Sequence, residues 1–158
     1  MGYWNIVEPV WDAINIYDGP QVFAQTFGSA PRASGLLFAA HFCQSEVCNG
    51  GFQQFFGNST GVLAPEAVEG FHEIGQPQIA ALIEEAMSLI GTPYPRDRNE
   101  REPRLTQISR SSLDALDEMF HSLIESARLA ALKLRQTVTR LRNIQQRSEA
   151  QLPRASYC

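Results

Sequence analysis

The chain has 158 residues, of which 44% are apolar and 9% aromatic, so it can form one globular core and is unlike a disordered chain. No apolar run approaches the roughly 20 residues that span a bilayer, and the N-terminal stretch carries Glu8 and Asp12 instead of a basic secretion signal. The net charge of −4 is unevenly divided, since residues 1–95 carry −8 and residues 96–158 carry +4. Three cysteines in such a chain indicate reduced thiols, and we therefore expect a cytoplasmic protein without a membrane segment.

Helices are predicted along most of the chain, with almost no strands. Five of them precede residue 92, with apolar residues at three- and four-residue spacing and with proline near the start or glycine after the end: residues 6–17, 20–28, 36–48, 65–75 and 77–91. Residues 28–35 and 92–104 have the composition of loops. The predicted fold class is all-α, a single compact multi-helix domain with a long C-terminal helix.

The last helix is predicted to begin at a capping box formed by Ser111 and Asp114 and to run to about residue 147. Its apolar positions recur at three- and four-residue spacing from Leu113 to Ile144. One continuous helix of this length would extend roughly 50 Å at 1.5 Å per residue.

We divide the chain into a helical domain, residues 1–125, and a basic helical extension, residues 126–158. Two interpretations of the helix in this extension remain open. Arg128, Arg135 and Arg142 repeat every seven residues beside apolar positions, which favours a homodimer through the C-terminal helix. The other interpretation is a helix whose first half packs on the core and whose second half frays. Direct nucleic-acid binding by the Arg-rich segment is a weaker alternative, because the segment lacks aromatic residues for base stacking over most of its length.

Motifs for nucleotide binding or hydrolysis are absent from the sequence. His41, Cys43 and Cys48 lie close together, but a helix would direct the two sulfurs to different faces, and no second pair of ligands follows. We therefore expect no metal, no cofactor and no catalytic site. Cys43 and Cys48 are expected to be small buried residues.

A cluster of polar residues lies in the most apolar and aromatic part of the chain: Glu46, Asn49, Gly50, Gly51, Gln53, Gln54 and Asn58. If the helix continued, Glu46, Asn49 and Gln53 would share one face. A carboxylate in this setting needs a partner, because leaving it bare costs several kcal/mol. We favour a structural role, in which Glu46 accepts bonds from backbone N–H groups at the glycine turn and the Asn and Gln side chains complete the network. The alternative is a pocket between Glu46 and Asn58 that binds a small molecule or catalyses a reaction.

The segment EVCNGGFQQFFGNSTGVLAPEAVEGFHEIG, residues 46–75, resembles the bacterial DNA-mimic-protein family, and the likeness extends over about residues 3–124. The matching positions are Glu46, Asn49, Gly50, Gly51, Phe52, Gln54, Phe55, Phe56, Asn58 and Gly61. The resemblance implies an all-α domain, often a homodimer, that binds a transcription factor by presenting carboxylates where DNA presents phosphates. It implies no catalytic residues.

We therefore expect a non-catalytic protein-interaction domain whose acidic face binds a basic DNA-binding protein. Glu66, Glu69 and Glu73 recur at i, i+3 and i+7, about 4.5 and 6 Å apart along a helix, which is comparable to the spacing of successive phosphates. With Glu84 and Glu85 they form the predicted partner-binding face. The whole-chain charge of −4 is low for a mimic of duplex DNA, which carries one charge per ~1.7 Å of axis.

Overall fold

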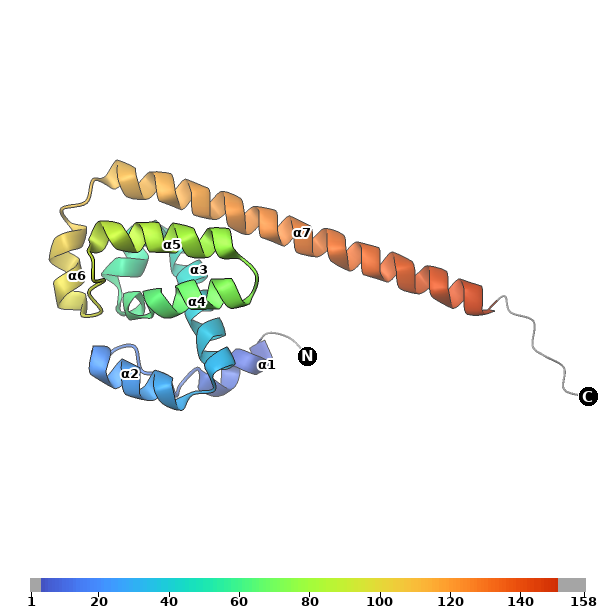
Figure 1. Ribbon diagram of the computed structural model, residues 1–158, viewed down its shortest axis with the longest axis horizontal. Coiled ribbons are helices and arrows are strands. Elements are labelled where there is room, and N and C mark those ends of the chain that lie inside the picture. The colour runs from blue at the N-terminus through green and yellow to red at the C-terminus, as the bar shows by residue number, and fades with distance from the viewer. Residues whose placement is uncertain (1–3, 151–158) are drawn as a thin grey trace, which may run out of the picture. The chain divides into compact units, whose positions relative to one another are not determined.

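The structure, a computed structural model, describes residues 4–150, and the side chains of these residues except 141 and 143–150. The regular elements in this range are all helical (Figure 1): α1 (Trp4–Val7), the 3-10 helix η1 (Glu8–Val10), α2 (Pro20–Ser29), α3 (Arg32–Gly57), the 3-10 helix η2 (Ser59–Leu63), α4 (Ala64–Glu73), α5 (Pro77–Ile90), α6 (Arg98–Leu105) and α7 (Arg110–Ala150). The predicted all-α fold and long C-terminal helix are confirmed.

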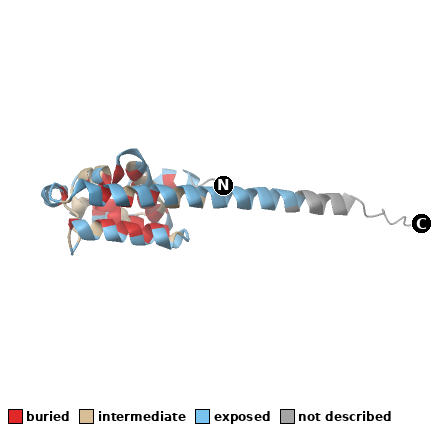
Figure 2. Ribbon diagram, turned by 90° about the horizontal axis from the view of Figure 1, so that it is seen from above, coloured by how far each residue is buried: buried red, intermediate tan, exposed pale blue. Residues whose placement is uncertain are grey.

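The chain divides into two compact units, Met1–Leu123 and Ile124–Cys158, here named unit 1 and unit 2, and α7 contributes to both. Buried residues gather in unit 1, whereas the described side chains of unit 2 are exposed except for the half-buried Ile124 and Ala127 (Figure 2). The domains predicted from the sequence divide the chain two residues later, at 125. None of the described helices combines the length and apolar character that a membrane span requires.

Phenylalanine side chains form the centre of unit 1. Phe52 of α3, Phe71 of α4 and Phe120 of α7 are at most 1% exposed. The ring of Phe120 lies edge-on at 5.6 Å from that of Phe52 and at 6.2 Å from that of Phe71, so the first part of α7 closes the core over α3 and α4. Burial of each such ring contributes roughly 1.5–3 kcal/mol. α3 and α4 also approach closely, because a Cβ at Gly70 would lie 2.4 Å from the carbonyl oxygen of Leu36.

Proline and glycine set the boundaries of α4 and α5 as the sequence predicted. Pro65 and Pro77 lie in the first turn of each helix, where the missing N–H has no intrahelical partner to lose. Gly75 and Gly91 follow the two helices with φ angles of 75° and 148°, a region that favours glycine. These two predicted helices are confirmed.

The predicted helix over residues 6–17 is wrong. Only the short α1 and η1 are helical there, and the chain then turns. The side chain of Asn15 accepts hydrogen bonds from the N–H groups of Tyr17 at 2.9 Å and Asp18 at 3.2 Å. Because an asparagine side chain can offer the backbone a local alternative to the helical bond, it ends the helical path here.

Both predicted loops contain helix. α3 begins inside the first loop, residues 28–35, and α6 lies inside the second, residues 92–104. The side chain of Asp97 accepts a hydrogen bond from the N–H of Asn99 at 2.8 Å and caps α6. The low apolar content of this segment favoured a loop, whereas its capping residue Asp97 indicates a helix.

α7 also begins earlier than predicted. The N–H of Ser112 donates to the hydroxyl of Ser109 at 3.3 Å, which makes Ser109 the cap and places the predicted box at Ser111 and Asp114 two residues too late. The helix has 41 residues, about 60 Å at 1.5 Å per residue.

The predicted apolar series of α7 is buried only in its first part. Leu113, Leu116 and Phe120 are at most 5% exposed, whereas Leu134 is 66% exposed. The last members of the series, Leu141 and Ile144, lie outside the described side chains, and residues 151–158 of the predicted extension lie outside the described chain.

Candidate functional site

The motif of residues 46–61 surrounds a kink in α3. Gly50 and Gly51 have non-helical backbone angles, with φ −149° and ψ 20° at the first and φ 72° and ψ −177° at the second. The positive φ favours glycine, and a Cβ at Gly51 would also lie 2.1 Å from Oδ2 of Asp117. The helix end predicted at these glycines is therefore a change of direction, after which the chain is helical again from Phe52.

Asp117 of α7 caps the second part of α3. Its Oδ1 accepts a hydrogen bond from the N–H of Phe52 at 2.8 Å, across 65 residues of sequence. Burial raises the pKa of the Asp117 carboxyl, and the bond from Phe52 partly opposes this shift. We expected Glu46 to accept the backbone N–H groups of this turn. That part of the prediction is wrong, because the described hydrogen bonds to Glu46 come from side chains. The expected amide side chains, those of Gln54 and Asn58, do complete the network.

Glu46 accepts hydrogen bonds from three side chains that follow the kink. Gln54 Nε2 and Asn58 Nδ2 donate to its Oε2 at 2.6 and 3.0 Å. Thr60 Oγ1 donates to its Oε1 at 3.3 Å. The half-buried carboxylate therefore has a partner at each oxygen, and the network ties the first part of α3 to its second part and to η2.

Two residues of the predicted cluster lie apart from this network. Asn49 and Gln53 are exposed, and neither donates to Glu46 among the described hydrogen bonds. The i, i+3, i+7 spacing defines one face only on a continuous helix, and the backbone changes direction between these positions. The predicted shared face of the three residues does not form.

Arg101 of α6 is fully buried and holds the end of the motif. Its Nε and Nη2 donate to the carbonyl oxygens of Phe56 and Asn58, each at 2.9 Å, and its Nη1 donates to that of Arg96. The first two carbonyls end α3, where the polarity of a helix attracts a cation. Burial lowers the pKa of Arg101. A Cβ at Gly61 would lie 2.9 Å from both Nε and Nη2, so the guanidinium needs a glycine beside it.

Sequence reasoning missed both Arg101 and Asp117. For Arg101 there was a signal, because Asp97 and Glu100 have the spacing of a capping box and indicate the helix that carries it. No local pattern connects Asp117 with the N–H of Phe52.

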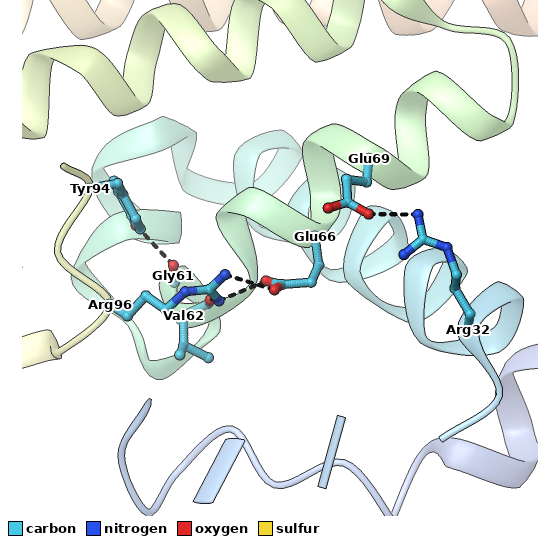
Figure 3. A network of polar contacts seen from close by, with 7 residues as sticks. All are labelled: Arg32, Gly61, Val62, Glu66, Glu69, Tyr94 and Arg96. Carbon is cyan, nitrogen blue, oxygen red and sulfur yellow. Dashed lines mark hydrogen bonds and ion pairs between the residues drawn. The ribbon is translucent and has the colours of Figure 1, made fainter. Parts of the chain in front are cut away.

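Arg96 neutralises Glu66 inside unit 1 (Figure 3). Its Nη1 and Nη2 donate to the two carboxylate oxygens at 2.9 and 2.8 Å, and Nη1 also donates to the carbonyl oxygen of Val62 at 3.0 Å. Beside this pair, the Tyr94 hydroxyl donates to the carbonyl oxygen of Gly61 at 2.8 Å, and burial raises the pKa of Tyr94. The Glu66 side chain is only 15% exposed, so its carboxylate has a structural role and is largely inaccessible to a partner protein.

The other acids of the predicted face are exposed. Glu69 pairs with Arg32 at 2.8 Å, but the two side chains are 52% and 70% exposed, and such surface pairs contribute little (Figure 3). Glu73, Glu84 and Glu85 are exposed and have no ion pair within the described part of the chain. The predicted face therefore consists of one internal carboxylate and four that are open to solvent.

Unit 1 is much more acidic than the whole chain. Residues 1–123 contain fifteen acids and six arginines, a net charge of −9, and residues 124–158 carry +5. Eleven of the fifteen acids are exposed, against four exposed arginines. The two remaining arginines of unit 1, Arg96 and Arg101, are held by internal carboxylate and carbonyl groups.

The cysteine predictions have opposite outcomes. Cys43 is buried as expected, and burial raises the pKa of its thiol. Cys48 is exposed, so its predicted burial is wrong. Among the side chains that the structure describes, no three His, Cys, Asp or Glu residues are grouped as a metal ion would require.

A known family matches most of the chain. Residues 28–139 match the DMP19-like protein family, a range that covers more than two thirds of the sequence. The range includes the whole segment of residues 46–75. It also continues into α7 beyond residue 124, where the resemblance inferred from the sequence ended. Searches among curated proteins and among solved structures gave no significant match.

Proposed function

Since the chain belongs to the DMP19-like protein family, a family of DNA mimics, we propose that unit 1 is a non-catalytic domain that binds a DNA-binding protein, such as a transcription factor. The observation that carries the proposal is the charge of unit 1, −9 in total, with eleven exposed carboxylates against four exposed arginines. A surface of this sign attracts the same basic protein surfaces that duplex DNA attracts. We propose that it acts in the bacterial cytoplasm, where such a partner would be found.

The contact surface we propose lies on α4 and α5, which pack against each other. Its carboxylates are those of Glu69, Glu73, Glu84 and Glu85, all of which are exposed. Glu66 is not part of this surface, because Arg96 already holds both of its oxygens. Its proposed role is to fix α4 against the segment that carries Arg96.

The test is capture of a DNA-binding protein from an extract of the host on the immobilised full chain. We expect capture at low salt, loss of capture as salt rises, and displacement of the captured protein by duplex DNA. Displacement distinguishes mimicry from other binding, because only a partner that uses its DNA-binding surface is released. A captured protein that duplex DNA leaves in place would contradict mimicry.

Two triple variants with the same change of charge locate the surface. The combination Glu73→Lys, Glu84→Lys and Glu85→Lys should reduce capture at least tenfold. The control combination Glu8→Lys, Asp12→Lys and Glu102→Lys alters exposed acids elsewhere in unit 1 and should reduce it by less than threefold. Equal losses would show that only total charge matters, and unchanged capture by the first variant would refute this surface.

A small-molecule or catalytic role of the Glu46 cluster has less support. Both carboxylate oxygens of Glu46 already accept hydrogen bonds from Gln54, Asn58 and Thr60. An ordered small molecule beside Glu46 in a crystal structure would reverse this preference.

We also propose that copies of the chain associate through unit 2. Support comes from large apolar side chains on one face of α7 that are exposed in the single chain, Leu134 and Val138 at 66% and 47%. These two residues are neighbours at i and i+4, and contiguous exposed apolar groups mark contact surfaces. Light scattering should give the mass of a dimer at micromolar concentration. A monomer that retards duplex DNA in a gel would instead favour nucleic-acid binding by the basic segment.

A further inference from the structure

An apolar groove follows one face of α3 where it meets α4. Two adjoining cavities of about 510 and 430 Å³ share Leu37 and Ile74 in their linings. Along α3 the lining runs from Arg32 to Cys48, about 24 Å at 1.5 Å per residue. Its central part is lined by Leu36, Leu37, Ala40 and Ile74, and polar residues lie at both ends. Ile74 at the end of α4 is 46% exposed. In the single chain this groove has the length and the apolar lining that the binding of an amphipathic helix requires.

The charges beside the groove are acidic in sum. Glu73 lines it without an ion pair in the described chain, and Arg32 at the same end is already paired with Glu69 at 2.8 Å. The groove belongs to a unit with a net charge of −9. A helix that docks here should therefore carry an apolar stripe bordered by cations.

The described part of unit 2 has these properties. Ala127, Ala131, Leu134 and Val138 lie at i, i+4, i+7 and i+11 and form one stripe about 17 Å long. Arg128, Arg135 and Arg142 border the stripe, and residues 124–142 contain five cations and one acid. The stripe is shorter than the groove, and the cations that border it are opposite in charge to the acidic unit 1.

We propose that this stripe of α7 occupies the α3–α4 groove of a second copy of the chain. The inference rests on the proposed self-association and identifies the surface to which α7 binds. Pairing α7 with α7 would bring two basic segments together in either orientation, whereas docking on unit 1 joins a segment of positive charge to a unit of −9. Reciprocal docking of two tails closes a symmetric dimer, because each copy offers one stripe and one groove.

Cysteine cross-linking tests the seat, because the exposed Cys48 lines the groove. One chain carries Leu134→Cys, Cys48→Ser and Cys158→Ser, and an isotopically heavy chain carries Cys158→Ser alone. After mild oxidation of the mixture, mass spectrometry should find a light–heavy disulfide between Cys48 and position 134, or between Cys48 and position 127 or 138 when the new thiol is placed there instead, because these positions cover both directions of docking. The matched control moves the new thiol to Leu129→Cys, about 140° around the same helix, and should give at least tenfold less of this bond.

Each other outcome overturns the groove as the seat. A disulfide between two thiols at position 134 would indicate a coiled coil, which leaves self-association intact and refutes docking on unit 1. A chain that carries both Leu134→Cys and Cys48 and forms the bond only within itself would refute the second copy as occupant. Equal yields from positions 134 and 129 would refute the stripe.

Charged substitutions give an independent measurement on the whole chain. Leu134→Lys with Val138→Lys should halve the mass seen by light scattering, whereas Leu129→Lys with Leu132→Lys should leave it unchanged. All four positions are exposed, so the variants should fold. Capture of the DNA-binding protein should persist in both variants, which separates failure of the dimer from failure of the acidic surface. An unchanged mass for the first variant would refute the proposal.

Discussion

Arginine is used in opposite ways in the two units. In unit 1, Arg101 is fully buried against three carbonyl oxygens, and Arg96 holds both oxygens of Glu66. In unit 2, Arg128 forms an ion pair with Glu125 at 3.5 Å, but the two side chains are 72% and 63% exposed. The same side chain is structural where packed helices surround it with acceptors, and it remains available to a second molecule where its helix face is exposed to solvent.

Removing one arginine from each unit gives the largest expected contrast. Arg101→Ala should lower the free energy of unfolding by about 3–5 kcal/mol, because three carbonyl groups lose a charged donor in the interior. Arg135→Ala should change it by less than about 0.5 kcal/mol, since its side chain is exposed. Urea denaturation followed by circular dichroism measures both. Similar losses for the two variants would contradict the different roles assigned to Arg101 and Arg135.

Glu46 tests whether a carboxylate of unit 1 is also structural. Glu46→Gln should cost about 1–3 kcal/mol of unfolding free energy, because an amide N–H would face the donors of Gln54 and Asn58. Capture of the DNA-binding protein by the folded fraction should not change. A variant of normal stability that loses capture would instead place Glu46 in the contact surface.

Two glutamates of α4 show the same difference in burial within one helix. Glu66→Gln should cost about 1–2 kcal/mol, because it breaks a bidentate pair with Arg96 that is largely shielded from water. Glu69→Gln should cost less than about 0.5 kcal/mol, because its pair with Arg32 is exposed. High salt should reduce only the stability cost of Glu69→Gln, which is already small, because its ion pair is exposed to solvent. Thermal unfolding at two salt concentrations checks both expectations, and equal costs would refute the assignment of Glu66 to the interior.

The smallest expected effect concerns pH and Asp117. Burial raises the pKa of this carboxyl above its ordinary value of 3.8, so the folded chain binds a proton more readily than the unfolded chain. The stabilisation from protonation is complete below pH 3.8 and is lost as pH rises through the raised pKa. Asp117→Asn keeps an acceptor for the N–H of Phe52 without the charge.

The asparagine variant should therefore equal or slightly exceed the wild-type chain in stability at pH 7, and the difference should shrink on acidification. Asp117→Ala removes the acceptor and should cost about 1 kcal/mol at pH 7. Denaturation curves for the three chains between pH 4 and pH 7 give the comparison. A wild-type advantage over the asparagine variant that grows as pH rises would contradict the direction of the pKa shift.

The amino-acid pattern alone predicted the helical fold and several of the helix boundaries. Pro65 and Pro77 begin helices and Gly75 and Gly91 follow them, because proline and glycine restrict backbone geometry within a single turn. The motif of residues 46–61 predicted the family for the same reason, since its residues lie side by side in the chain. The failures at residues 6–17 and 92–104 concern short segments, where one side-chain cap, at Asn15 or Asp97, outweighs the apolar pattern.

Which charges are internal depends on how the helices pack. The bond from Phe52 to Asp117 spans 65 residues, that from Arg101 to Phe56 spans 45, and the pair of Arg96 and Glu66 spans 30. Spacing along one helix placed Glu66 in an outward face with Glu69 and Glu73, because helical periodicity contains no information about an arginine on another segment. A charge becomes structural when a distant segment supplies its partner and removes its water, and both conditions arise only when the helices pack.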